Sequence, residues 1–318
     1  MRIGFLGLAA ALVMAIGACS RPAPVSIASQ VWVGYEPMFL ARTKRWLDED
    51  LVELHETASA SDSLQALAQG DVDGAALTLD EVLLARAQGI PLTIILVFNI
   101  SVGADVILAR VPLDSLSDLQ GQRVGFEHGA VGELMIVEAL RRAGLSLSDI
   151  ESVDLPSTRQ VGAWEAGQVD VIVSYEPVAS QLRALGAVDV FDSREIPEYI
   201  VDVLAVRSDR LDGARAPALR HLVAMHLRAL DHLQRNPQDS AYRMSARLGL
   251  PAAEVLPAFR GLVLPDAQNN YRLLHGRSPV LLDTTRELLA FKIENGLLDR
   301  ADSLDGLVSS RYLPPQAH

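Results

Sequence analysis

Short apolar runs alternate with amphipathic stretches along the first two thirds of the chain. Turn residues bound the apolar runs, as they bound strands, whereas the stretches between them repeat apolar positions at helical spacing. We predict strands at residues 25–33, 51–56, 72–77, 92–98, 104–109, 123–126, 152–155, 169–174, 188–191 and 200–206. We predict helices at residues 38–47, 62–69, 79–88, 131–143, 158–166 and 178–185. This alternation favours an α/β fold with mostly parallel sheets covered on both faces.

The apolar pattern becomes helical throughout after Val206. Predicted helices occupy residues 217–234, 237–248, 252–261 and 280–296. In the first of them the apolar positions recur on one buried face: Leu219, Leu222, Val223, Leu230 and Leu233. The C-terminal third is therefore predicted to be helical.

One short pattern occurs once in each half of the α/β region. A helix gives way to a strand at residues 70–73 (GDVD) and again at residues 167–170 (GQVD). Each pattern follows a strand, a turn of small residues and a helix. The duplication indicates two similar domains that face one another across a cleft.

The first twenty residues have the features of an export signal. An apolar run of about 14 residues follows Met1 and Arg2; it suits a signal-peptide core and is too short to span a bilayer. Residues 16–19 (IGAC) resemble a bacterial lipobox, so we predict a signal peptide at residues 1–18, lipidation of Cys19 and a tether at residues 19–24. A cleaved ordinary signal with an incidental cysteine is the alternative. The predicted location is the cell envelope, lipid-anchored and facing the periplasm or the outer face of the cell membrane.

Length, charge and cysteine content limit the class of protein. The 318 residues exceed what one compact core usually serves, which favours two domains. The net charge of −12 and the pI near 5.0 argue against nucleic-acid binding, because phosphate contacts need clustered Lys and Arg. Cys19 is the only cysteine, so no internal disulfide can form. No later segment is apolar and long enough to span a membrane, so membrane contact is predicted through the N-terminal lipid only.

Several short motifs together resemble one group of transport proteins. They are residues 32–37 (WVGYEP), 67–75 (LAQGDVDGA), 116–125 (LSDLQGQRVG), 164–170 (WEAGQVD) and 175–177 (YEP). Behind a lipobox, they resemble the solute-binding proteins of ABC importers in the nitrate, sulfonate and taurine group, which also includes binders of thiamine-pyrimidine precursors. The resemblance covers residues 25–298, nearly the whole mature chain.

The resemblance implies a type II periplasmic-binding-protein fold, with two Rossmann-like lobes joined by two crossover strands and a helical C-terminal part. Lobe 1 would hold residues 25–102 and 204–312, and lobe 2 would hold residues 103–203. Closure about a hinge near Gly103 would bury the ligand. The resemblance also implies a monomer that delivers a small molecule to an ABC permease and its ATPase.

Candidate ligand contacts lie in turns at the carboxyl ends of the predicted strands, where α/β folds bind ligands. Aromatic faces can stack on a ligand, helix N-termini leave N–H groups free, and small residues let the backbone approach closely. The predicted contacts are Trp32, Tyr35, Glu36, Ser59, Ser61, Thr78, Asp80, Glu127, His128, Gly129, Ala130, Tyr175 and Glu176. Structural alternatives stay open: Trp32 in the core, Asp80 as a helix cap and Glu176 as an acid favoured at a helix start. Ser59 and Ser61 can likewise serve as N-caps.

The predicted cleft is rich in acids, which lie at its turns and on the crossover strands: Asp80, Asp105, Glu127, Glu176 and Asp202. Sulfonate or nitrate capture would favour Arg or Lys there, yet Arg159 is the only basic residue near one of these turns. Carboxylates closed into a cleft need a cation or a hydrogen-bond donor to offset desolvation. The hypothesis is a ligand with an amine, amidine or aminopyrimidine group, alone or beside an acidic group held by helix N-termini.

An envelope enzyme or a ligand-sensing lipoprotein of the same fold is the alternative function. The chain has no G-x-S-x-G elbow and no H-E-x-x-H motif, and Cys19 is assigned to lipidation. His221, His226 and His232 share a predicted helix, but their spacings do not suit a shared metal. We therefore predict no enzyme activity, no cofactor and no metal. The predicted role is capture of a sulfonate, taurine-like, nitrate-like or aminopyrimidine nutrient for import.

Overall fold

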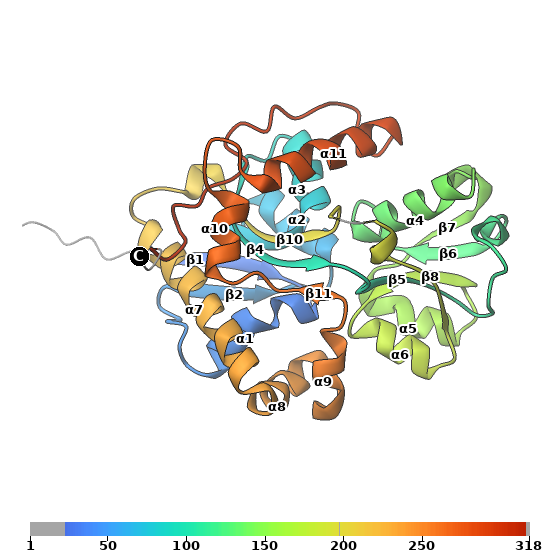
Figure 1. The fold of residues 1–318 in the computed structure, drawn as a ribbon, viewed down its shortest axis with the longest axis horizontal. Helices are drawn as coiled ribbons and strands as arrows, with labels where there is room; N and C mark the ends of the chain where they lie inside the picture. The colour runs from blue at the N-terminus through green and yellow to red at the C-terminus, as the bar shows by residue number, and fades with distance from the viewer. Residues whose placement is uncertain (1–22, 197, 316–318) are drawn as a thin grey trace, which may run out of the picture.

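The computed structural model describes residues 23–196 and 198–315, which form two lobes, each built around one β-sheet (Figure 1). The strands are β1 (Val25–Ser29), β2 (Val52–Glu56), β3 (Gly74–Thr78), β4 (Leu92–Ser101), β5 (Asp105–Ala109), β6 (Arg123–Phe126), β7 (Glu151–Asp154), β8 (Val171–Tyr175), β9 (Val188–Asp192), β10 (Val201–Arg207) and β11 (Leu262–Val263). The sheet of lobe 1 has the order β11-β4-β10-β3-β1-β2, and that of lobe 2 the order β7-β6-β8-β5-β9. The predicted signal peptide and Cys19 lie outside the described residues.

Helices cover both faces of each sheet. They are α1 (Glu36–Thr43), α2 (Ala60–Gln69), α3 (Leu79–Ala87), α4 (Val131–Arg142), α5 (Ser157–Glu165), α6 (Val178–Ala184), α7 (Ala216–Arg235), α8 (Pro237–Leu248), α9 (Ala252–Ala258), α10 (Ala267–Leu274) and α11 (Val280–Glu294). In lobe 1, α1, α7 and α8 lie on one face and α2, α3 and α11 on the other; in lobe 2, α4 lies opposite α5 and α6 (Figure 1). Within the described ranges, none of these helices has the length and apolar character needed to cross a membrane.

The two sheets share one layout. Read from one edge, β2-β1-β3-β10-β4 in lobe 1 corresponds to β7-β6-β8-β5-β9 in lobe 2. The expectation of mostly parallel pairing is wrong at the centre of both sheets, because β10 and β5 run antiparallel to both of their neighbours. Each of these strands comes from the other lobe and enters its sheet at the end where the neighbouring strands finish. Parallel pairing remains between β1 and its neighbours and between β6 and its neighbours.

The duplicated GDVD and GQVD patterns have the same structural role in both lobes. Asp73 accepts a hydrogen bond at Oδ2 from the backbone N–H of Ser26, at 3.0 Å, near the start of β1. Asp170 accepts one at Oδ2 from the backbone N–H of Arg123, at 3.2 Å, at the start of β6. The aspartate before β3 therefore ties that strand to β1, and the aspartate before β8 ties that strand to β6.

The C-terminal third completes lobe 1. β11 pairs with the end of β4, where Leu262 lies opposite Ser101, and Val308 forms a bridge with Ile94 farther along the same strand. Helix α11 packs against α3. The sequence pattern did not predict β11 or α10. Both elements are short, and β11 pairs with β4, which lies far away along the chain.

The chain passes between the lobes at two neighbouring segments, residues 101–105 and residues 192–201. Gly103 adopts φ +106°, a conformation that other L-residues rarely take. Its N–H donates to Ser193 Oγ at 2.6 Å, and Ser193 Oγ lies 2.7 Å from Ser101 Oγ. The two crossings are thus hydrogen-bonded to each other at the predicted hinge. The lobe boundaries at residues 102–103 and 203–204 stay a prediction.

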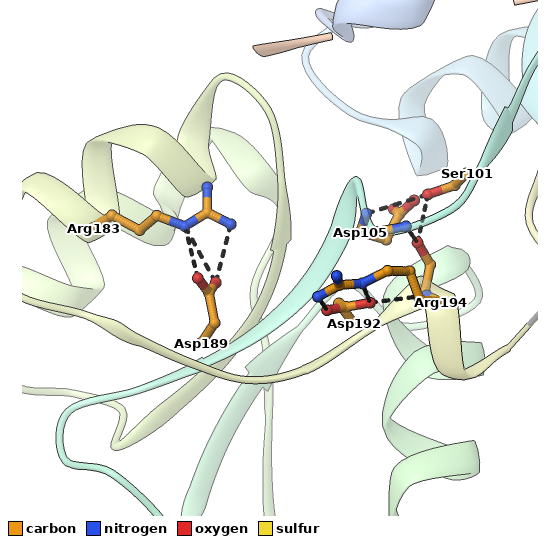
Figure 2. A network of polar contacts seen from close by, with 8 residues as sticks. Ser101, Asp105, Arg183, Asp189, Asp192 and Arg194 are labelled. Atoms are coloured by element: carbon orange, nitrogen blue, oxygen red, sulfur yellow. Dashed lines mark hydrogen bonds and ion pairs between the residues drawn. The ribbon is translucent and has the colours of Figure 1, made fainter. Parts of the chain in front are cut away.

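Figure 2 shows the two crossings side by side. On one of them, the backbone N–H of Asp105 donates to Ser101 Oγ at 3.2 Å. On the other, Arg194 forms an ion pair with Asp192 at 2.5 Å. Arg194 is therefore paired with an acid of its own segment.

A third segment contacts the hinge. The carbonyl of Gly261 accepts a hydrogen bond from the N–H of Val102 at 2.6 Å. A Cβ atom on Gly261 would lie 2.6 Å from the carbonyl carbon of Gly103, too close for any side chain. The absence of a side chain at position 261 lets the segment before β11 rest directly on the hinge backbone.

Candidate ligand-binding site

A small cavity lies between the two lobes. Lobe 1, including β10, contributes Gln30, Trp32, Ala60, Thr78, Glu81 and Asp202 to its lining. Lobe 2 contributes Asp105, Glu127, Ala130, Val131, Gly132, Gln160, Val173, Ser174 and Tyr175. All of these residues are buried except Tyr175, which is half-buried, so the lobes are closed over this space.

Two contacts join the lobes beside the cavity. The rings of Trp32 and Tyr175 meet edge to face, with centroids 5.3 Å apart and planes at 82°. The backbone N–H of Ser61 donates to Glu127 Oε1 at 2.9 Å. Each contact takes one residue from each lobe, so opening of the lobes would separate both pairs.

Tyr35 lies behind the lining rather than in it. Its ring is fully buried against Phe98, with centroids 5.1 Å apart, and its hydroxyl donates to Asp202 Oδ1 at 2.5 Å. The amide of Asn99, oriented so that Nδ2 donates to Asp202 Oδ2 at 2.8 Å, accepts a hydrogen bond from Trp32 Nε1 at 3.3 Å. The turn after β1 therefore fixes the position of the Asp202 carboxylate.

Gly34 makes this arrangement possible. A Cβ atom at this position would lie 2.0 Å from the side-chain amide of Asn99 and 2.5 Å from Trp32 Nε1. The glycine in the WVGYEP motif is therefore required by side-chain packing behind the cavity.

Glu36 points away from the cavity. Its buried carboxylate forms an ion pair with Arg247 of α8, which also pairs with Glu56 at 2.9 Å and lies over the Phe39 ring. Burial raises the pKa of Glu36 to about 7, and the charge of Arg247 acts in the opposite direction. The residue ties α1 to α8.

Ser59 and Ser61 flank the start of α2, and both have structural partners. Ser59 is the N-cap, and its Oγ accepts a hydrogen bond from the N–H of Asp62 at 3.1 Å. Ser61 is exposed, and only its backbone N–H reaches across to Glu127. Ala60, between the two serines, is the residue of this turn that lines the cavity.

The turn after β3 separates two adjacent acids. Thr78 and Glu81 form a capping box, in which the Thr78 N–H donates to Glu81 Oε2 at 2.8 Å, and Thr78 Oγ1 donates to Asp80 Oδ1 at 2.6 Å. Lys292 of α11 donates to the Asp80 carbonyl at 3.1 Å and lies 3.5 Å from Asp80 Oδ2. Asp80 is thus paired with a buried cation, whereas Glu81 lines the cavity.

The loop between β6 and α4 contributes only some of its residues to the cavity lining. Glu127 and Ala130 line it. His128 is exposed, and its ring packs at a tilt against that of Phe126, with centroids 4.7 Å apart. Its backbone N–H donates a hydrogen bond to the Asp154 carboxylate. Gly129 is not in the lining; its positive φ of 71° turns the chain into α4.

Tyr175 is the last residue of β8, and Glu176 follows it. The two side chains make different contacts. Tyr175 lines the cavity opposite Trp32. Glu176 is held by Arg183 of α6 at 2.8 Å and by the N–H of Ser180 at 3.1 Å. The carboxylate of Glu176 therefore stabilises the start of α6.

Five of the predicted contacts come together at the cavity: Trp32, Thr78, Glu127, Ala130 and Tyr175. The remaining predicted residues make the contacts described above outside its lining: Tyr35, Glu36, Ser59, Ser61, Asp80, His128, Gly129 and Glu176. The sequence reading did not single out the lining residues Gln30, Gln160 and Ser174. Ser174 carried a usable signal, because it is polar in the otherwise apolar interior of a buried strand.

The lining carries four carboxylates and no basic side chain: Glu81, Asp105, Glu127 and Asp202. Burial raises the pKa of Glu81 and of Asp202 well above the usual range, and the neighbouring acids Asp80 and Asp105 raise them further. Burial also raises the pKa of Asp105 to about 7. The charged forms of these acids are costly here because no cation in the lining balances them.

Several buried polar atoms of the lining have no hydrogen-bond partner within the described residues: Gln30 Oε1, Glu81 Oε1, Asp105 Oδ2, Gln160 Oε1, Ser174 Oγ and the Tyr175 hydroxyl. Buried polar groups are nearly always paired, and an unpaired one costs free energy. Such a group of atoms around one cavity is the arrangement of a site that hydrogen-bonds a polar ligand. Among the described residues, no group of three or more His, Cys, Asp and Glu side chains is placed to hold a metal ion.

Comparison with known proteins adds a family and a fold. The model of the family described as "NMT1/THI5 like" matches residues 33–240. The chain is 27% identical over 261 residues to an Escherichia coli (strain K12) protein to which aliphatic-sulfonate binding is ascribed, covering 79% of this chain and 80% of that protein. It is also 27% identical over 289 residues to the riboflavin-binding protein RibY of Chloroflexus aurantiacus, with 80% of each chain covered.

A solved structure has the same architecture. The alkanesulfonate-binding protein SsuA from Xanthomonas axonopodis pv. citri superposes with a TM-score of 0.73 at 21% identity, over 88% of this chain and 96% of that one. A likeness of this extent confirms the predicted type II fold of two lobes joined by crossover strands. At this identity it shows the fold and does not specify a ligand.

Proposed function

This chain belongs to the NMT1/THI5-like family, and we propose that it is the solute-binding component of an ABC importer. It closes two lobes over a small polar organic molecule and delivers that molecule unaltered to a membrane permease and its ATPase. The observation that carries the proposal is the buried cavity between the lobes, whose lining includes polar atoms without partners. The family resemblance drawn from the sequence motifs is confirmed at the level of the family.

The proposed contacts are the residues that line the cavity. Trp32 and Tyr175 supply ring surfaces from opposite lobes, and Glu81, Asp105 and Glu127 supply hydrogen-bond acceptors. A micromolar dissociation constant, adequate for nutrient uptake, corresponds to about −8 kcal/mol. A few hydrogen bonds and an aromatic contact in a closed cleft can provide that free energy. The candidate ligands are a sulfonate, a taurine-like or nitrate-like solute, or an aminopyrimidine.

The proposed location is the periplasm or the outer face of the cell membrane, with a lipid on Cys19 as the anchor. The signal-like residues 1–18 and the lipobox-like residues 16–19 support this proposal. We also propose that the protein works as a monomer, as the family resemblance implies. Mass spectrometry of the protein recovered from its membrane fraction, before and after lipoprotein-lipase treatment, tests the anchor.

Closure and release of an unaltered ligand can be measured directly. Native mass spectrometry of the gently purified protein should show a bound small molecule, and denaturation should release it with its mass unchanged. Small-angle scattering should then show a smaller radius of gyration with the identified molecule than without it. A released product of different mass would favour an enzyme, and scattering that never changes with any bound molecule would contradict closure.

A further inference from the structure

We propose that the ligand of this cavity is a small organic cation, an amine or an amidine, whose N–H groups face the carboxylates of both lobes. This inference rests on the proposed solute-binding function and names the chemical class that the site takes. It excludes simple anions such as nitrate and alkanesulfonates as the physiological ligand.

The first support is a surplus of hydrogen-bond acceptors in the lining. Two side-chain donors of the lining are used within the protein: Trp32 Nε1 donates to Asn99, and Thr78 Oγ1 donates to Asp80. Gln160 Nε2 donates to the carbonyls of Val173 at 2.9 Å and of Leu155 at 3.3 Å, which leaves its Oε1 unpartnered. The unpartnered carboxylate and amide oxygens of the site are therefore free to accept hydrogen bonds from a ligand, while the hydroxyls of Ser174 and Tyr175 can donate or accept.

The free acceptors come from both lobes and are deeply buried. Glu81 Oε1 belongs to lobe 1 and Asp105 Oδ2 to lobe 2, and these residues are 1% and 3% exposed. Gln160 and Ser174, 2% and 1% exposed, add two further unpartnered oxygens from lobe 2. A ligand with several N–H groups can reach acceptors on both sides at once, which would also stabilise closure.

The second support is that the nearby cations are already paired. Lys292 is held by Asp80, and Arg183 is held by Glu176 and Asp189. Arg247 pairs with Glu36. An anion in the cavity would therefore meet buried carboxylates without a compensating positive charge, which is strongly unfavourable.

An organic cation reverses this balance. Paired with a carboxylate, an amidine makes two parallel charge-assisted hydrogen bonds, and an amine makes up to three single ones. The edge-to-face rings of Trp32 and Tyr175 add a surface that favours positive charge. The raised pKa of Asp105 and of Glu81, caused first by burial, reports the same lack of positive charge in the lining.

Matched pairs of probes with one carbon frame and opposite charge test the ligand class. Calorimetry on the purified protein would compare ethylamine with ethanesulfonate, acetamidine with acetate, and benzamidine with benzenesulfonate. We expect at least one cation to bind and to bind more tightly than its anionic partner by about tenfold or more. Taurine, which carries both groups, should bind no more tightly than ethylamine.

Tighter binding of the anion in any pair, or binding of none of the cations, would overturn the inference. The proposed function fails separately, if no bound molecule closes the lobes in the scattering experiment. A protein that closes on an anion and ignores every cation keeps its function and loses this ligand class.

Substitution of a lining acid adds a second test. Asp105→Asn keeps the size of the side chain and removes its charge, so affinity for the bound cation should fall by about tenfold or more. The matched control is Asp189→Asn, which removes an acid of lobe 2 that lies outside the lining. It should change the affinity by less than about twofold. Equal losses in both variants would contradict a direct contact between Asp105 and the ligand.

Discussion

Asp202 receives its hydrogen bonds from Tyr35 and Asn99, neither of which lines the cavity. The two donors hold both carboxylate oxygens while the residue itself contributes to the lining. At the scale of single residues, Asp202 lines the cavity, and the side chains of Tyr35 and Asn99 behind the lining hold its carboxylate in place. Such support fixes a buried acid that no cation balances.

Removing the Tyr35 hydroxyl tests this support. Tyr35→Phe keeps the ring against Phe98 and leaves Asp202 Oδ1 without its donor, so the free energy of unfolding should fall by about 1–3 kcal/mol. The measurement is urea unfolding of the ligand-free protein. Tyr271→Phe, in a half-buried tyrosine whose ring stacks on His275, should change the free energy of unfolding by less than about 0.5 kcal/mol. Equal effects of the two variants would show that the Tyr35 hydroxyl contributes nothing.

The buried acid Asp105 predicts a dependence of stability on pH. Burial and the charge of Asp80 raise the pKa of Asp105 to about 7, while a hydrogen bond from Ser101 acts the other way. Asp202 is also close, since Asp105 raises the pKa of Asp202 in turn. The folded state then binds more protons than the unfolded state between about pH 4 and pH 7. The contribution of Asp105 to stability is therefore greatest at acid pH and falls as the pH rises through this window, whereas buried His226, whose pKa burial lowers to about 3, acts in the opposite direction.

Without ligand, the contribution of Asp105 to the free energy of unfolding should be smaller at pH 8 than at pH 5. Asp105 alone contributes up to about 4 kcal/mol to the difference in free energy of unfolding, because its pKa is about 7 in the folded protein against the usual value of about 4. Asp105→Asn should reduce this slope when unfolding is followed across the range. Asp212→Asn should leave the slope unchanged, because hydrogen bonds from Arg215 lower the pKa of Asp212 and keep it ionised throughout. An Asp105→Asn variant with the same pH dependence as the wild type would contradict the assignment.

At the scale of elements, α3 and α11 are joined through one buried ion pair. Lys292 on α11 and Asp80 on α3 are 5% and 1% exposed at their side chains, with Nζ 3.5 Å from Oδ2. The pair takes Asp80 out of the cavity and leaves Glu81 as the acid of that turn in the lining. The C-terminal helix therefore takes part in setting the charge of the site.

Lys292→Met should lower the free energy of unfolding by about 3–5 kcal/mol, because it leaves a buried carboxylate without its cation. The other lysine of the chain provides the control. Lys44 pairs with Asp239 at 3.0 Å, and the two side chains are 19% and 37% exposed. Lys44→Met should therefore cost no more than about 1 kcal/mol. Chemical unfolding of both variants gives the comparison. Similar losses in the free energy of unfolding would show that the buried pair stabilises the protein no more than the exposed one.

At the scale of the whole molecule, the hinge determines whether the two lobes can close. Gly261 rests on the backbone of Gly103, so a side chain at position 261 would separate segments that meet at the crossing. Gly261→Ala should weaken closure, seen as a larger radius of gyration than wild type in saturating ligand. It should also lower the free energy of unfolding by more than the about 1–2 kcal/mol that positive φ alone costs.

Gly249→Ala separates backbone strain from contact with the hinge. Gly249 also has positive φ, at 63°, but a Cβ there would have no neighbour within 4 Å. Its variant should lose stability and still close as wild type does. If Gly249→Ala opened the molecule as much as Gly261→Ala, the contact between Gly261 and Gly103 would not matter for closure.

The sequence by itself determined the succession of strands and helices, the export-like start, the family and the acidic character of the cleft. These follow from local patterns, because burial on one face of an element repeats at the period of that element. Residue order also predicted which turns approach the cavity, as Trp32, Glu127 and Tyr175 show.

Only the tertiary structure decided which side chain of each turn faces the cavity. Glu36 and Asp80 are predicted ligand contacts from the sequence. In the structure, Arg247 of α8 pairs with Glu36, and Lys292 pairs with Asp80. Such partners lie more than two hundred residues away along the chain, so no local period contains them. The antiparallel centres of both sheets were hidden for the same reason, since strand direction depends on the lobe from which the chain arrives.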